Sequence, residues 1–110
     1  MKMPHADNAL VPDAKITAYL LNPNHPKGKE KAAVFTRFGF SVAKWEEMGD
    51  ALRHHASEHE VTSSHRTAHC EIYILEGALS TPDGRDLQVR SVWCVRHGET
   101  IPRLITAYPL

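Results

Sequence analysis

The stretch of residues 21–32 combines proton-carrying and charged side chains with two prolines. It holds His25, the lysines Lys27, Lys29 and Lys31, and the prolines Pro23 and Pro26. Proline fixes its own φ and biases the preceding residue toward extended backbone, so we predict a stiff loop that leads into a helix. The unpaired N–H groups of a helix start attract anions, whereas lysines placed there do not serve helix stability. The pattern favours a phosphate site, and a solvated loop with idle lysines is the alternative.

Further candidate groups lie in strand-like segments near the end of the chain. Arg90 stands in an otherwise apolar strand, where a charge must be paired, exposed or used. Alternation along the last strand gives Leu104, Thr106 and Tyr108 the same parity, so the two hydroxyl groups are expected on one face. Taken singly, an ordinary strand threonine and a tyrosine that covers the core are the simpler interpretations.

Together these residue types suit the cleavage of RNA without a metal ion or cofactor. That reaction needs a group that accepts the 2′-hydroxyl proton, cations that stabilise the crowded phosphorane, and a group that protonates the leaving oxygen. Histidine is the best-matched proton carrier near neutral pH and contributes roughly 10²–10⁴-fold to such rates. Lysine and arginine stabilise the developing phosphate charge, and hydroxyls position its oxygens. The sequence supplies these groups but does not show that they converge.

The two cysteines and the other histidines support a metal site less well. Cys70 and Cys94 lie in apolar, strand-like stretches without a paired spacing, which predicts buried free thiols. A zinc site is a third possibility, assembled from His65, His69, Cys70 and His97. This spacing matches no standard zinc template, and we therefore expect no metal.

The totals describe one ordinary globular domain over residues 1–110. Lys plus Arg and Asp plus Glu number 13 each, so the formal net charge is zero with neutral histidines. This balance does not indicate a strongly basic nucleic-acid binder, and any basic site must be a local patch. No apolar run is long enough for a signal peptide or a membrane span, and we expect a cytoplasmic protein.

Hydrophobic periodicity predicts the elements that must position the candidate groups. Residues 1–11 are expected to form an extended arm laid on the body. Helices are predicted at about residues 12–21, 27–38 and 41–58. The first has Tyr19 on its apolar face, and the last has His54 and His55 near its negative pole. From residue 60 the period changes to two, which predicts strands at 61–66, 68–79, 87–96 and 101–108. The expected fold class is α+β, with three N-terminal helices packed on a three- to four-stranded antiparallel sheet.

Several segments together resemble a small bacterial family of unknown function. They are residues 19–32 with the pattern Y-L-L-N-P-x-H-P-x-G-x-x-K-A, the Phe38-Gly39-Phe40 break, and the runs T-P-D-G-R at 81–85, V-R-S-V-W at 89–93 and P-R-L-I-T-A-Y-P at 102–109. The resemblance covers nearly the whole chain. That family has no settled activity, so it implies a fold relationship more than a mechanism.

A more distant likeness is to the barnase–EndoU–colicin–RelE superfamily. It rests on helices that precede an antiparallel sheet, a His/Gly/Lys segment at a helix start, and a last strand that ends in Thr-x-Tyr-Pro. The likeness implies a barnase/RelE-like fold and a toxin-type, metal-independent endoribonuclease. By position, the catalytic residues that it nominates are His25, Lys31, Arg90, Thr106 and Tyr108. The candidate nucleic-acid contacts are Lys27, Lys29 and Arg103.

Two interpretations of function follow from these patterns. In the first, the chain is the toxin of a toxin–antitoxin or polymorphic toxin system, RNA is its substrate, and a cognate antitoxin or immunity protein neutralises it. In the second, the chain is a non-catalytic protein-binding module, an immunity or antitoxin-like protein. Zero net charge favours the second, because nucleases that act on a polyanion are often basic. Expression separates the two, since only a toxin should arrest growth without its partner.

Overall fold

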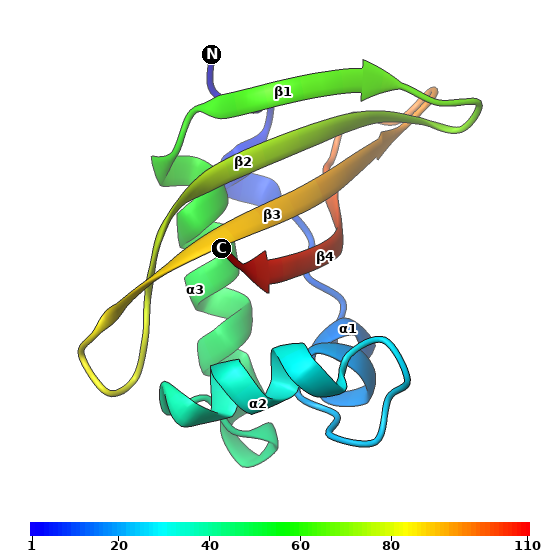
Figure 1. Ribbon diagram of the computed structural model, residues 1–110. Coiled ribbons are helices and arrows are strands. Elements are labelled where there is room, and N and C mark those ends of the chain that lie inside the picture. The colour runs from blue at the N-terminus through cyan, green and yellow to red at the C-terminus, as the bar shows by residue number, and fades with distance from the viewer.

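Short turns connect neighbouring strands, so the second half of the chain folds into an antiparallel meander. In the computed structural model, which describes all of residues 1–110, the strands pair in the order in which they occur in the sequence. They are β1 (Val61–Arg66), β2 (Cys70–Ser80), β3 (Asp86–Arg96) and β4 (Arg103–Pro109). The β2–β3 hairpin is the longest part of the sheet (Figure 1). The predicted α+β class with an antiparallel sheet is confirmed, with four strands.

Three α-helices come before the sheet in the chain. They are α1 (Asp13–Lys15), α2 (Lys29–Arg37) and α3 (Trp45–Glu58), and a π-helical turn, Ile16–Leu20, continues α1. The prediction that all three are N-terminal is wrong for α3, which occupies the middle of the chain. Ser41 caps the turn that leads into α3, because its Oγ accepts the backbone N–H of Lys44 at 3.3 Å. None of these helices has the length and the apolar run that a membrane crossing requires.

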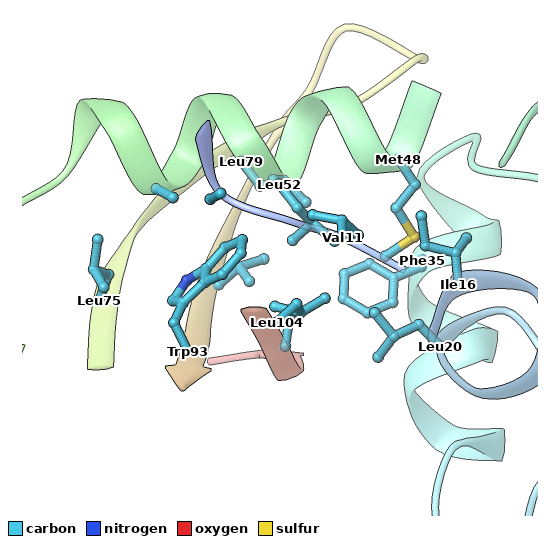
Figure 2. Packing of buried hydrophobic residues seen from close by; sticks show 14 of the residues in the cluster. Val11, Ile16, Leu20, Phe35, Met48, Leu52, Leu75, Leu79, Trp93 and Leu104 are labelled. Atoms are coloured by element: carbon cyan, nitrogen blue, oxygen red, sulfur yellow. The ribbon is translucent and has the colours of Figure 1, made fainter. Parts of the chain in front are cut away.

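The hydrophobic core lies between the sheet and α3, which runs across one face of it (Figure 1). Trp93 of β3 is fully buried there, between Leu75 of β2 and Leu104 of β4 (Figure 2). Phe35 of α2 is also fully buried and lies beside Ile16 of the π-helical turn (Figure 2). This second contact fixes α2 against the turn, and α2 also contacts β4.

The N-terminal arm is packed into the core, which corrects the prediction that it lies on the body. Its buried residues are Met3, Ala6, Ala9 and Val11. Three of these recur at every third position, so one side of the arm presents a continuous apolar row to the core. The arm also pairs with β4, because the backbone N–H of Leu104 donates to the carbonyl of Leu10 at 2.9 Å.

Cys70 of β2 and Cys94 of β3 form a disulfide, so the prediction of free thiols is wrong. Their Cα atoms are 5.4 Å apart. Cys94 pairs with Ile72, and residues two apart on one strand share a face, so the hairpin register brings the thiols together. The bond removes Cys70 from the candidate zinc set, and no group of three His, Cys, Asp or Glu side chains is placed to hold a metal ion. Disulfides are unusual in the reducing cytosol. This bond therefore gives no support to the predicted cytoplasmic location.

His55, which was predicted to lie near the negative pole of its helix, is buried. Its Nε2 lies 3.1 Å from the carbonyl oxygen of Val89, and its Nδ1 lies 3.1 Å from Ser91 Oγ. Ser91 Oγ also accepts the indole N–H of Trp93 at 2.9 Å. A neutral ring with its proton on Nε2 satisfies all of these groups. Burial, helped by the charge of His59, lowers the pKa of His55 to about 4.

Candidate functional site

The phenol of Tyr19 lies at the centre of the predicted site residues. Lys31 Nζ donates a hydrogen bond to Tyr19 Oη at 2.9 Å, and Oη shares a hydrogen bond with Thr106 Oγ1 at 3.0 Å. The ring centroids of Tyr19 and His25 are 4.8 Å apart. Residues from the loop, from α2 and from β4 therefore meet around one tyrosine. The sequence pattern assigned Tyr19 only to the apolar face of a helix, and its place at the start of the family-like segment was the only signal of another role.

The backbone around Tyr19 is built to hold it. The backbone N–H of Leu21 donates to the carbonyl of Ile16 at 2.8 Å, which closes a π-helical turn. Such turns are rare and are frequently found at functional sites. Gly28 packs directly against this turn, because a Cβ added there would lie 2.9 Å from Tyr19 Cδ1 and would also collide with the Tyr19 carbonyl. The loop can approach Tyr19 this closely only with glycine at that position.

His25 is held by the loop that carries it. Its Nδ1 accepts the backbone N–H groups of Lys27 and Gly28, each at 3.0 Å. Because Nδ1 is the acceptor, the neutral ring carries its proton on Nε2. The imidazole therefore offers a ligand an N–H donor, while its lone pair is used inside the loop.

Two depressions open beside these residues, and both contain Lys27. The main cleft has a volume of about 630 Å³ and is lined by Pro12, Ala14, Lys15, Ala18, Tyr19, His25, Lys27, Ile105 and Thr106. The side cleft has a volume of about 450 Å³ and is lined by Lys27, Glu30, Lys31, Val34, Tyr108 and Pro109. No carboxylate lines the main cleft, although the whole chain has zero net charge. The local surplus of cations favours an anionic ligand.

A β-bulge aims Thr106 at Tyr19. The register of β4 shifts at Ile105, because Leu104 and Thr106 pair with adjacent residues of β3. Leu104 is consequently buried in the core, and Thr106 lies on the opposite face of the sheet with Tyr108. The predicted shared parity of Leu104 and Thr106 is wrong, whereas that of Thr106 and Tyr108 agrees with the register. Bulges often lie next to functional sites, where they redirect a side chain.

Arg90 and Tyr108 form a second polar group next to the side cleft. They are cross-strand partners, and Arg90 Nη1 donates to Tyr108 Oη at 3.1 Å. Glu76, the partner of Arg90 on β2, forms an ion pair with it, so the charge in the apolar strand is paired. Hydrogen bonds with Tyr108 and Glu76 hold the pKa of Arg90 above its ordinary value. Lys31 Nζ lies 6.0 Å from the centroid of the Tyr108 ring and thus connects this group to Tyr19.

Three of the predicted residues lie outside the two clefts. Lys29 is exposed on α2 and lines neither of them. Arg90 contributes only through Tyr108. Arg103 lines a further depression of about 310 Å³, which continues from the main cleft through Lys15 toward the disulfide.

The surroundings of Tyr19 change its acidity. Partial burial raises the pKa of Tyr19, but hydrogen bonds with Lys31 and Thr106 and the charges of Lys31 and Lys15 outweigh it. The pKa of Tyr19 consequently lies below its ordinary value. A phenol with a lowered pKa exchanges protons closer to neutral pH than a free tyrosine does, and such groups are typical of functional sites.

Comparison with known proteins places this fold among solved structures. A chain of the contact-dependent growth inhibition toxin–immunity protein complex from Klebsiella pneumoniae 342 is similar, with a TM-score of 0.71, 16% sequence identity and 96% of each chain covered. At this identity the likeness shows a shared fold. No curated protein matches the sequence. Residues 2–110 match the family described as a domain of unknown function, DUF6883, and the chain therefore belongs to the DUF6883 family.

Proposed function

We propose that this domain is a toxin-type endoribonuclease that cleaves RNA without a metal ion and that a cognate immunity or antitoxin protein neutralises it. One observation carries the proposal: every polar side chain that lines the main cleft can donate a hydrogen bond, and none is a carboxylate. A phosphodiester suits such a set, because each of its unesterified oxygens accepts hydrogen bonds. RNA is the substrate class that supplies its own nucleophile, the 2′-hydroxyl, and so needs no metal-bound water.

In this proposal, the predicted residues that line the clefts bind and stabilise the phosphate. Lys27, which lines both clefts, and Lys31, which contacts Tyr19, face the scissile phosphate and stabilise its developing charge. The Nε2–H of His25 donates to a phosphate oxygen, as the tautomer set by its loop allows. Thr106, which lines the main cleft beside Tyr19, positions the phosphate.

The remaining candidates extend the site along the RNA strand. The ring of Tyr108 in the side cleft stacks on a base, and Arg90 fixes its hydroxyl. Arg103, beyond Lys15, and Lys29, on the exposed side of α2, contact flanking phosphates. A strand of several nucleotides is therefore the expected ligand, with its backbone following the cationic side chains.

The fold is consistent with this role. A solved chain that shares it belongs to a contact-dependent growth inhibition toxin–immunity protein complex. Helices that precede an antiparallel sheet, and a last strand with Thr106 and Tyr108 on one face, are also the arrangement expected for a barnase/RelE-like ribonuclease. Both are analogies of fold, and the cleft supplies the chemical argument.

Cleavage of RNA in the presence of EDTA tests the proposal. The purified protein should degrade a mixed cellular RNA preparation under these conditions. Lys31→Met should strongly lower the cleavage rate at neutral pH, because it removes the ammonium that bonds to Tyr19. Lys44→Met is the matched control, since Lys44 is an exposed lysine on the turn before α3. Equal activity of the Lys31 and Lys44 variants, or no cleavage by the wild type, would contradict the proposal.

The immunity role is the second candidate, and the sheet edge is the observation that favours it. β1 is an edge strand that pairs with β2 in the sheet. The N–H of Val61 donates to the carbonyl of Met1 at 2.7 Å, and the rest of the outer side of β1 offers backbone groups to a strand of another protein. Zero net charge also suits a protein-binding module. Expression in a bacterium without neighbouring genes decides between the two, because a toxin arrests growth and an immunity protein does not.

A further inference from the structure

We propose that Tyr19 and Lys31 act as the proton-transfer pair of the RNA cleavage, with Tyr19 as the base and Lys31 as the acid. This inference rests on the proposed function and adds a residue that the sequence patterns did not nominate. It also changes the expected part of His25, which binds phosphate and does not accept the proton.

The geometry joins the two groups to each other and to the cleft. Tyr19 Oη is 2.9 Å from Lys31 Nζ and 3.0 Å from Thr106 Oγ1. Lys31 Nζ also donates to the carbonyl of Lys27 at 3.1 Å, which fixes the ammonium in place. Tyr19 lines the main cleft, Lys31 lines the side cleft and Lys27 lines both, so a phosphate bound at Lys27 lies next to both groups.

The other ionisable groups around Tyr19 leave it as the best proton acceptor. Lys15 of α1 lies 5.8 Å from the Tyr19 ring centroid and is a cation. His25 uses Nδ1 to accept two backbone N–H groups. β4 contributes only the hydroxyl of Thr106 here. The positive charge of Lys15 stabilises a negative charge on Tyr19, and His25 and Thr106 do not oppose it. The lowered pKa of Tyr19 is consistent with this environment.

The reaction balances within the pair. The Tyr19 phenolate accepts the proton of the 2′-hydroxyl, and the 2′-oxygen forms a bond to the adjacent phosphorus. The bond from phosphorus to the 5′-oxygen breaks, and that oxygen takes a proton from the Lys31 ammonium. The products are a 2′,3′-cyclic phosphate and a 5′-hydroxyl. Lys31 is then neutral and Tyr19 is a phenol, and the hydrogen bond between them returns the proton from oxygen to nitrogen.

Three variants of the full chain separate the roles. Tyr19→Phe keeps the ring beside His25 and Gly28 and should preserve the melting temperature, but it should lower the cleavage rate by at least roughly 100-fold. Its affinity for an RNA with 2′-deoxyribose at the cleaved position should be unchanged. Lys31→Arg keeps a cation but donates its proton poorly, so it should lower the maximal rate without moving the pH midpoint. Lys31→Met should move that midpoint upward.

A spectroscopic titration reports on Tyr19 without using activity. The ultraviolet absorbance of the Tyr19 phenolate is the difference between the wild type and Tyr19→Phe. The pH at which this absorbance appears should lie below the ordinary tyrosine range near pH 10, and it should be higher in Lys31→Met. The pH midpoint of cleavage should match it. Wild-type cleavage with an equally active Tyr19→Phe overturns the proton-transfer role and leaves the ribonuclease proposal standing. A wild type that cleaves no RNA overturns the proposed function and this role with it.

Discussion

Nδ1 of His25 lies 3.0 Å from the backbone nitrogen of Gly28, so the imidazole is part of the hydrogen bonding of its own loop. The N–H of Lys27 donates to the same atom. Nδ1 thus stabilises the loop, and Nε2 can bind a ligand. The structural role of Nδ1 can therefore be tested separately from the role that we propose for Nε2.

We predict that His25→Asn keeps the fold and loses RNA cleavage. The amide oxygen of Asn can replace Nδ1 as the acceptor for the two loop N–H groups, but no atom replaces Nε2. His25→Ala leaves both N–H groups without a side-chain acceptor and should cost about 1 kcal/mol of stability as well. Chemical denaturation and an RNA cleavage assay of both variants make the comparison. Full activity of His25→Asn would show that Nε2 has no role.

We predict that Gly28→Ala displaces Tyr19 and impairs both stability and cleavage. The φ of Gly28 is −100°, which alanine adopts freely, so the effect comes only from the collision of the new Cβ with Tyr19. Overpacking of this kind costs about 1–3 kcal/mol.

Gly84→Ala is the matched control for that change. Gly84 has φ +87° and open space around it, so alanine there costs about 1–2 kcal/mol through backbone strain alone. Its cleavage rate should equal that of the wild type. If the two variants lose activity equally, the contact between Gly28 and Tyr19 does not matter for the site.

Local patterns predicted the fold well where neighbouring residues decide it. The alternation in the second half of the chain predicted β1 at the observed bounds, Val61–Arg66. The failures share a cause, which is dependence on distant partners. The pairing of Cys70 with Cys94 follows from hairpin register, and the burial of the N-terminal arm follows from its contacts with α3 and β4.

The candidate site shows the same division. His25 and Lys31 were nominated because the segment 21–32 has an unusual local composition. Tyr19 was missed because a tyrosine on the apolar side of a helix usually belongs to the core, and only the approach of Lys31 and Thr106 gives it another role. The bulge at Ile105, which turns Thr106 to the cleft, has no sequence signal of its own.

We predict that reduction of the Cys70–Cys94 disulfide lowers stability by about 3 kcal/mol, as expected for the closure of a loop of this length in the unfolded chain. For a domain of this size the melting temperature should fall by roughly 10 °C. Differential scanning calorimetry with and without a phosphine reductant measures it. The double variant Cys70→Ala/Cys94→Ala should show the lower value and no response to the reductant. An unchanged wild-type melting temperature would mean that the bond does not constrain the unfolded chain.

We predict that acidification destabilises the domain through His55. Burial first, and the charge of His59 second, lower its folded-state pKa to about 4, whereas an unfolded histidine titrates near 6.5. Between these values the unfolded chain binds the extra proton, so stability is full above about pH 6.5 and falls as the pH drops toward 4. The total loss should be roughly 3 kcal/mol. Urea denaturation at pH values from 7.5 to 4.5 measures it. His55→Gln should flatten the slope, whereas His54→Gln should keep it, because His54 is exposed and pairs only with Glu58 on the helix surface. A slope that persists in His55→Gln would assign the acid sensitivity to other groups.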